Sequence, residues 1–244
     1  MAEADEQDSG ALRSFTGIPN VILSVACFLI AIGHLYVAFD PILSELERNA
    51  YHFAGFAALA AVLYPMWQGK SGNRAPVLLD AMIGLTVAIA AVWLAQAENA
   101  IYDRGVKFST PDWIAATICI LGAIELTRRV AGLIIPGLII IALTYIAYWG
   151  QFVGGIFAFP GLSVETVAFR SIYGDDAMFG TIARISSTYV FLFIIFGAFL
   201  LRSGAGEFVI NLARAVAGRM VGGPGIVAVI ASGLTGTISG SAVA

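Results

Sequence analysis

Residues 218–244 combine apolar side chains with glycines and hydroxyl groups, a set that could bind a cation without a charged ligand. This stretch contains seven glycines and five hydroxyl residues, namely Ser232, Thr235, Thr237, Ser239 and Ser241. Sodium is a hard cation, so neutral hydroxyl and carbonyl oxygens are suitable ligands. The small polar run TISGS also favours a backbone that leaves the helix, and carbonyls freed in this way line cavities in many transporters.

The same stretch has a second interpretation as a helix-packing surface. Small residues recur at every fourth position, at Ala228, Ser232, Gly236, Gly240 and Ala244. Such a stripe allows two helices in a membrane to approach closely. The pattern alone therefore leaves an ion or substrate site and a packing face as equal alternatives.

Two acids, Asp80 and Glu125, lie inside or at the end of long apolar runs. Acids at membrane depth are functional candidates by default. Glu125, however, precedes Arg128 and Arg129 by three and four residues, the spacing of a local helical ion pair. We therefore expect both acids to form structural ion pairs near one end of their helices.

Residue types typical of catalysis are scarce. The sequence has no HExxH, no Walker loop and no GxSxG motif, and it contains only two histidines, His34 and His52. Neither histidine has acids or cysteines at ligand spacing, and Cys27 and Cys119 lie within apolar runs as small hydrophobic residues. We expect no enzymatic activity and no organic cofactor.

The composition requires lipid as part of the solvent. Hydrophobic residues make up 59% of the chain and charged residues only 12%, whereas soluble domains carry about 25% charged residues. The net charge of −3 gives no indication of a nucleic-acid partner. The chain is expected to be embedded in a lipid bilayer.

Apolar runs long enough to cross a bilayer recur along the chain. A spanning helix needs about 20 apolar residues. Six such segments are predicted, at residues 17–39, 49–69, 75–97, 111–127, 130–150 and 177–201. The predicted fold is therefore all-α: a polytopic transmembrane helical protein with about six spanning helices and an interfacial helix; the start of a re-entrant hairpin is added to it only by the family resemblance given below.

Two further segments are predicted to lie along the membrane surface. Residues 203–219 place Phe208, Val209, Leu212, Ala213 and Val216 on one helical face, opposite the polar Glu207, Asn211, Arg214 and Gly218. Residues 160–176 have Ser163 as an N-cap candidate and Glu165 in the first turn. Residues 1–16 form an acidic tail without the features of a cleaved signal peptide.

The distribution of basic residues predicts the orientation. With the N-terminus in the cytoplasm, eight of the 13 basic residues lie on the cytoplasmic side: Arg13, Lys70, Arg74, Arg128, Arg129, Arg202, Arg214 and Arg219. Lys and Arg are enriched in cytoplasmic loops. The chain is thus expected to be a multi-pass protein with a cytoplasmic N-terminus.

Residues 188–244 carry a long, ordered series of motifs, FGAFL, SGAG, GGP and GTISGSAVA. This series resembles the large membrane subunit of tripartite ATP-independent periplasmic (TRAP) transporters. The resemblance is greatest to the TAXI-type fused permease, in which a small four-helix subunit precedes the large one. Residues 125–150 resemble the junction between the two.

The resemblance implies an elevator-type Na⁺ symporter in the bacterial inner membrane, which receives a small organic, carboxylate-like solute from a periplasmic solute-binding protein. It places Ser239, Gly240 and Ser241 at the tip of a re-entrant hairpin, where their oxygens help to bind sodium. It also implies four parts: the tail 1–16, a four-helix scaffold region 17–129, a junction with the first large-subunit helices 130–202, and the interfacial helix with the start of the transport hairpin 203–244.

The motif series stops at Ala244, so the sequence is expected to be an N-terminal fragment of such a permease. A non-transporting helical membrane scaffold that docks partner proteins is the alternative function.

Overall fold

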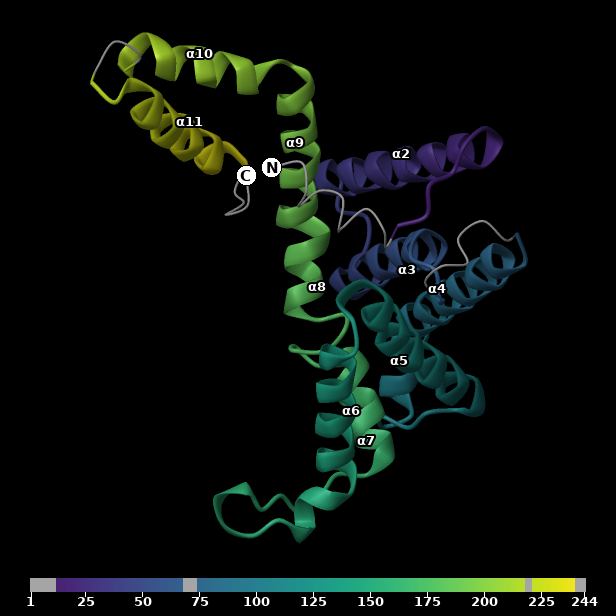
Figure 1. The fold of residues 1–244 in the computed structure, drawn as a ribbon. Coiled ribbons are helices and arrows are strands. Elements are labelled where there is room, and N and C mark those ends of the chain that lie inside the picture. The colour runs from purple at the N-terminus through teal and green to yellow at the C-terminus, as the bar shows by residue number, and fades with distance from the viewer. Residues whose placement is uncertain (1–11, 68–73, 218–220, 240–244) are drawn as a thin grey trace. The chain divides into compact units, whose positions relative to one another are not determined.

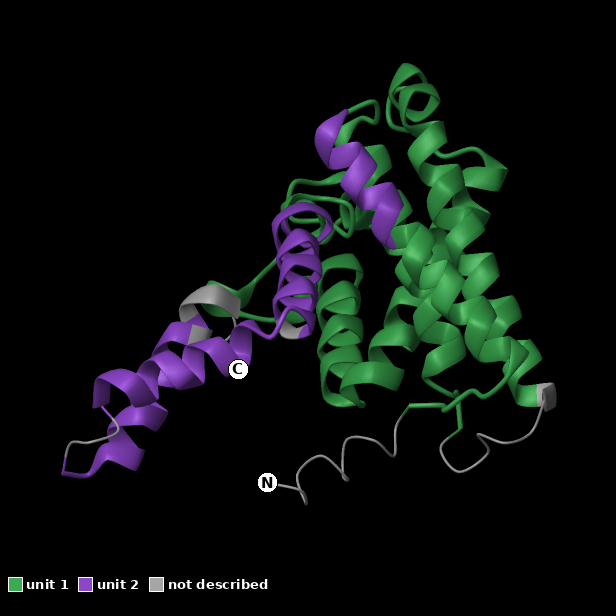
Figure 2. Cartoon of the chain, turned by 90° about the horizontal axis from the view of Figure 1, so that it is seen from above, with its two compact units in different colours: residues 1–30, 41–184 green, residues 31–40, 185–244 purple. Residues whose placement is uncertain are grey.

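The structure, a computed structural model, describes residues 12–67, 74–217 and 221–239 (Figure 1). The elements in these ranges are all helical, which confirms the all-α prediction. The described chain divides into two compact units: residues 1–30 with 41–184, and residues 31–40 with 185–244 (Figure 2). The boundary passes through helix α2 (Ile18–Phe39) and near the start of the helical run from Thr181 to Arg202. The four parts expected from the sequence remain a prediction.

The first unit is built around three neighbouring helices, α3 (Glu45–Leu63), α4 (Arg74–Asp103) and α5 (Thr110–Ala131). The buried face of α3 carries alanine at positions 50, 54, 57 and 61, the three- and four-residue spacing of one helical face. On α4, a methyl group added to Gly84 would lie 2.7 Å from Ala61 Cβ. Small residues thus bring α3 and α4 into close contact, as in many membrane helix pairs.

The ends of these helices are fixed by local chemistry. At the start of α3, the Ser44 hydroxyl accepts from the Glu47 N–H while the Glu47 carboxylate accepts from the Ser44 N–H. This reciprocal capping box satisfies two backbone donors that the first turn leaves free. Helix α5 ends at Gly132, whose φ of 77° suits a residue without a side chain.

The first unit continues through α6 (Ile134–Ala147), two short 3₁₀ turns, η1 (Trp149–Phe152) and η2 (Gly155–Phe157), and α7 (Val164–Tyr173). The Ser163 hydroxyl accepts from the Thr166 N–H at the start of α7, which confirms the predicted N-cap. Ala168 and Ile172 of α7 join the main apolar core with residues of α3, α4 and α5.

The second unit contains α9 (Phe191–Arg202), α10 (Ala205–Ala217) and α11 (Gly223–Ser239). Helix α9 continues α8 (Thr181–Ile185) through one π-helical turn, η3 (Ser186–Val190). Helices α10 and α11 pack together through Ala213, Ala217 and Val227. A glycine with positive φ directly precedes each of these two helices, Gly204 before α10 and Gly222 before α11.

Three described helical segments are long and apolar enough to cross a bilayer: Ile18–Phe39, Pro76–Asp103 and Thr181–Leu200. The other three predicted spans correspond to α3, α5 and α6, which are helical over most of the expected residues. The predicted multi-pass helical membrane protein is therefore confirmed.

Candidate functional site

Of the three predicted sodium ligands, the structure describes only Ser239, which lies at the end of α11. Helix α11 runs through Thr237 and Ile238 to Ser239, where the described part of the chain ends. Gly240 and Ser241 fall outside the described residues. The helix thus extends as far as the first predicted ligand.

The stripe of small residues on α11 is exposed over its described part. Ala228 and Ser232 are exposed, and a methyl group added at Gly236 would meet no atom within 4 Å. Helix α10 instead packs against another face, which contains Val227. The described residues therefore leave the ion-site and packing interpretations of this stripe open.

Helix α10 differs in part from the interfacial helix that the sequence predicts. Of its apolar residues, Val209 and Ala213 are buried, and Ala213 packs with α11, whereas Phe208, Leu212 and Val216 are exposed. The apolar face that the sequence predicts for a membrane-surface helix is thus partly covered by α11 and partly exposed.

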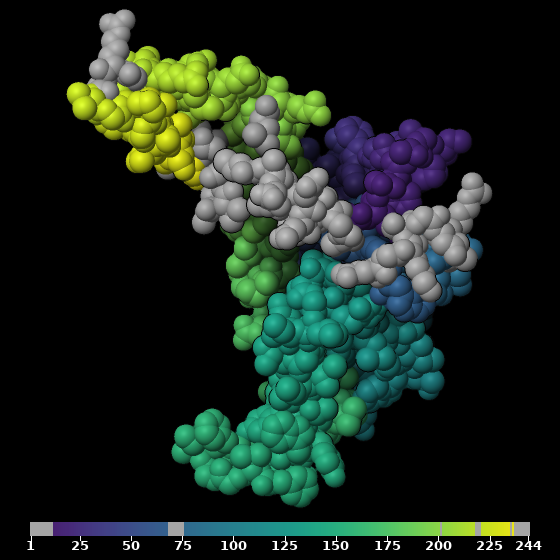
Figure 3. Space-filling view, in the orientation of Figure 1, coloured from purple at the N-terminus to yellow at the C-terminus, as the bar shows by residue number. Residues whose placement is uncertain are grey.

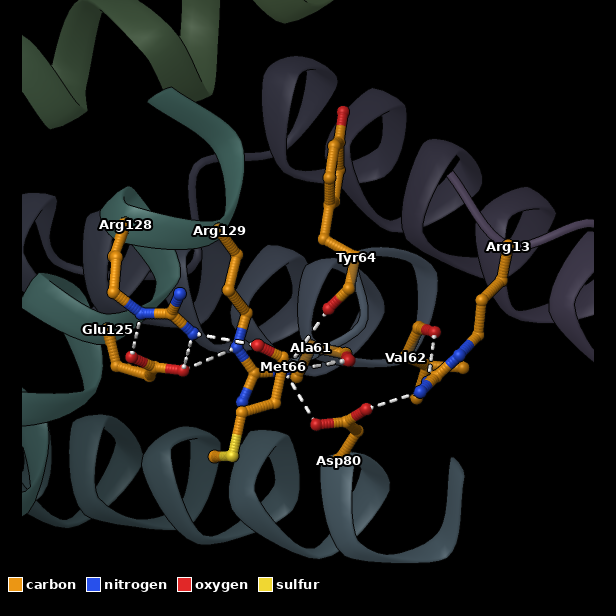
Figure 4. Close-up of polar contacts among 9 residues, drawn as sticks. All are labelled: Arg13, Ala61, Val62, Tyr64, Met66, Asp80, Glu125, Arg128 and Arg129. Carbon is orange, nitrogen blue, oxygen red and sulfur yellow. Dashed lines mark hydrogen bonds and ion pairs between the residues drawn. The ribbon is translucent and has the colours of Figure 1, made fainter. Parts of the chain in front are cut away.

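A second polar site, the Asp80 cluster, joins five charged residues in the first unit: Arg13, Asp80, Glu125, Arg128 and Arg129 (Figure 4). Asp80 lies between two guanidinium groups, with Oδ2 2.6 Å from Arg13 Nη2 and Oδ1 2.8 Å from Arg129 Nη1. The side chains of all three are at most 1% exposed. Burial of charge is tolerated here because each ion has an opposite charge within hydrogen-bonding distance.

Glu125 completes the Asp80 cluster on α5. Its carboxylate accepts from Arg128 Nε at 2.7 Å and from Arg129 Nε at 2.9 Å. These local ion pairs confirm the structural role expected for Glu125. Arg129 thereby bridges the two acids, one on its own helix and one on α4.

The guanidinium groups of the Asp80 cluster also bind backbone carbonyls where α3 ends. Arg13 donates to Val62 O, Arg129 to Ala61 O and Tyr64 O, and Arg128 to Met66 O. The last carbonyls of a helix lack partners within the helix, and the helix dipole favours cations there. The cluster therefore caps α3 and ties it to α4, α5 and the N-terminal segment.

This geometry assigns a structural role to Asp80. Both of its oxygens are bound by arginines, and no ligand is needed to explain the burial of the carboxylate. The sequence analysis missed Arg13, which it assigned to the acidic tail. Spacing cannot reveal this contact, because Arg13 and Asp80 are separated by 67 residues.

A third polar group surrounds Asp112 at the start of α5. The Asp112 carboxylate accepts from Arg104, from Trp93 Nε1 and from the backbone and hydroxyl of Ser109.

The buried Asn49 amide on α3 donates to Phe179 O and Gly180 O, 130 and 131 residues further along the chain. These contacts join loops and helix ends within the first unit.

Each of the two histidines packs against an aromatic ring. His34 packs its ring against Phe191, and His52 packs against Phe56. Cys27 and Cys119 are not joined in a disulfide. Among the described residues, no group of three or more His, Cys, Asp or Glu side chains is arranged to hold a metal.

Comparison with known protein families shows which family the chain belongs to. A family model described as the tripartite ATP-independent periplasmic transporter, DctM component, matches residues 118–244. The chain belongs to this TRAP transporter family. Neither a curated protein nor a solved structure matches it.

The TRAP family match covers residues 125–150 and 188–244, the two stretches that carry the resemblance, and it begins within α5. The protein is a membrane component of a transporter and not an enzyme. The family implies a membrane environment and a periplasmic binding protein as partner. The match includes the whole of the α10–α11 pair and the three predicted sodium ligands.

Proposed function

We propose that this TRAP component acts in a Na⁺-coupled, binding-protein-dependent secondary transporter for small, carboxylate-like organic solutes. The observation that carries the proposal is the match of residues 118–244 to the DctM family together with the GTISGS motif at the end of α11. The coupling ion is Na⁺, and the solute arrives from a periplasmic solute-binding protein.

The proposed sodium site consists of the Ser239 and Ser241 hydroxyls and the carbonyl at Gly240. Ser239 is the last residue of a 17-residue helix, which supports this assignment, because the carbonyl end of a helix is its negative end. Gly236 and Gly240 also allow backbone conformations that other residues avoid. All of these ligands are neutral oxygens, which suit a monovalent hard cation.

The proposed location is the bacterial inner membrane, with a cytoplasmic N-terminus. The excess of basic residues near one set of helix ends supports this orientation. The Asp80 cluster would then lie at the cytoplasmic ends of α3, α4 and α5, and Asp112 at their opposite ends.

We also propose the TAXI-type fused organisation, in which a small-subunit-like scaffold precedes the large subunit. The support is that four helices, α2 to α5, begin before residue 118, where the family match begins. Arginines on the N-terminal segment and on α5 bind the same acid of α4, as expected for a static scaffold.

Uptake into proteoliposomes tests the proposed function. The permease that carries this sequence is reconstituted with its binding protein, and entry of radiolabelled carboxylates is followed under an inward sodium gradient. We expect saturable uptake that requires both the sodium gradient and the binding protein. A potassium gradient of the same size serves as the control.

The alternative, a membrane scaffold that only docks partners, predicts a different outcome. The binding protein would associate with the reconstituted protein, but no solute would enter under either gradient. Uptake that is equal under the sodium and potassium gradients would instead retain transport and contradict sodium coupling.

A further inference from the structure

An uncharged aromatic loop joins α6 and α7 in the first unit. No Asp, Glu, Lys or Arg occurs between Arg129 and Glu165. The loop, which we define as residues 148–161, carries Tyr148, Trp149, Phe152, Phe157 and Phe159. Figure 1 shows it as the green segment extending beyond the ends of α6 and α7, and Figure 3 shows its surface.

The aromatic loop is closed by its own hydrogen bonds. Phe159 N donates to Gly150 O at 3.1 Å, and Leu162 N donates to Ile146 O at 2.9 Å. Two further bonds link the loop to α6: Tyr145 Oη donates to Phe157 O, and Trp149 Nε1 donates to Thr144 Oγ1. The loop is therefore held in place by hydrogen bonds within itself and to the end of α6.

Several large side chains of the aromatic loop are strongly exposed. Ile156 is 94% exposed and Phe152 71% exposed, and Tyr148 and Phe157 are also strongly exposed. Several large apolar side chains exposed within so short a segment are uncommon where a protein meets water. It is expected where a loop meets another apolar phase.

The length of α6 indicates that the apolar phase around the loop is the lipid bilayer. Fourteen residues span about 21 Å, less than the roughly 30 Å of a bilayer's hydrocarbon core. Helix α6 itself exposes Ile134, Leu138 and Ile141. Because α6 is shorter than the hydrocarbon core is thick, the aromatic loop that follows it begins within the hydrocarbon core or at its edge.

Contacts within the first unit show at which end of its helices the loop lies. The Glu165 carboxylate at the start of α7 accepts from Phe108 N, in the charged loop that joins α4 and α5. The aromatic loop therefore shares its end of the unit with a polar loop that contains Arg104 and Lys107. The aromatic loop is apolar and the loop that joins α4 and α5 is charged, although both lie at the same end of the first unit.

We propose that the aromatic loop is a membrane anchor that inserts Phe152, Ile156 and Phe157 into the boundary between lipid headgroups and acyl chains. Aromatic residues concentrate at this boundary in membrane proteins. Lipid is favoured over a docked protein because protein interfaces surround their apolar centre with a polar rim, and this loop contains no charged residue. The lipid contact follows from the loop itself, whereas its assignment to the outer leaflet rests on the proposed orientation.

Spin-label accessibility tests the anchor. In the Cys27→Ser, Cys119→Ala background, Ile156→Cys and Phe152→Cys are labelled separately with a nitroxide, and Lys107→Cys serves as the matched control at the same end. The proteins are reconstituted into vesicles of phosphatidylethanolamine and phosphatidylglycerol. For each label, collisions with oxygen, which partitions into lipid, are compared with collisions with a polar nickel complex.

The anchor predicts an oxygen-to-nickel collision ratio several-fold higher at positions 152 and 156 than at 107. Equal ratios at all three positions would place the loop in water and overturn the proposal. Nickel accessibility at 152 and 156 that is lost when the solute-binding protein is added would also overturn it, and would assign the loop to protein docking. Neither outcome depends on sodium coupling, so the test is separate from that of the proposed function.

Discussion

Asp80 shows how a single charged residue can have a structural role at membrane depth. Its carboxylate is buried between Arg13 and Arg129, and the same arginines bind carbonyls at the end of α3. Removing the acid would leave the buried Arg13 without its counter-ion and Arg129 with Glu125 alone. Such a loss costs more than the intact pair contributes, because the desolvated charges remain.

We expect Asp80→Asn to destabilise the detergent-solubilised protein by about 3–5 kcal/mol, the usual cost of breaking a buried ion pair. The matched control is Asp40→Asn, since Asp40 is an exposed acid. Thermal unfolding followed by size-exclusion chromatography gives the measurement. Equal melting temperatures for the two variants would show that the Asp80 cluster does not hold α3 and α4 together.

The serines of the GTISGS motif should behave differently from Asp80. Ser239→Ala or Ser241→Ala removes one neutral sodium ligand and leaves no buried charge. The loss of such a contact costs about 1–3 kcal/mol, or roughly a 5- to 150-fold weaker sodium affinity. Titration of uptake with sodium measures the half-saturation, with Ser232→Ala on the same helix as the control.

Unchanged half-saturation in both variants would contradict the sodium site and favour the packing interpretation. In that interpretation, alanine is as small as serine, so folding and sodium dependence both survive.

Sequence reasoning at the residue scale succeeded where partners are close in the chain. The Glu125 pairs with Arg128 and Arg129 follow from helical spacing, and the Ser163 cap follows from its place before an apolar run. The contacts of Arg13 with Asp80 and of Asn49 with Phe179 O do not follow, because they depend on which helices pack together.

At the scale of elements, apolar run length predicted nearly every helix, since a bilayer sets the length of a spanning segment. Which helices pack against one another could not be predicted from the sequence. The alanines of α3 lie in close contact with Gly84 of α4. The regular spacing of the alanines can be seen in the sequence, but the helix that packs against them cannot. The same holds for α10, whose buried Ala213 could not be separated from its exposed neighbours until α11 was placed.

Gly84→Ala should separate α3 from α4, because the added methyl would lie 2.7 Å from Ala61 Cβ and 3.1 Å from the Ala58 Cα. Overpacking of this kind costs about 1–3 kcal/mol. Gly137→Ala on α6 is the control, since no atom lies within 4 Å of its added methyl.

We expect a lower melting temperature for Gly84→Ala and an unchanged or higher one for Gly137→Ala, which also gains helix propensity. A Gly84→Ala protein as stable as the wild type would mean that α3 and α4 are not in the close contact described.

At the scale of the whole molecule, the family could be read from one ordered motif series, and the match to residues 118–244 agrees with it. Orientation, by contrast, depends on a modest excess of basic residues. It is open to a direct test because residue 72 lies in a polar segment between α3 and α4.

Gly72→Cys in the Cys27→Ser, Cys119→Ala background should resist a membrane-impermeant thiol reagent in cells with a permeabilised outer membrane. It should react after the inner membrane is also opened. Labelling before that step would reverse the proposed topology.

Sodium coupling is the central claim, and the simultaneous flux of sodium and solute tests it most directly. Proteoliposomes that contain the permease and begin with equal sodium inside and outside receive the binding protein loaded with a radiolabelled carboxylate. A symporter must carry both species, so we predict that radioactive sodium accumulates inside together with the carboxylate, and that Ser239→Ala weakens both fluxes at limiting sodium. Entry of the carboxylate without any sodium would contradict the account.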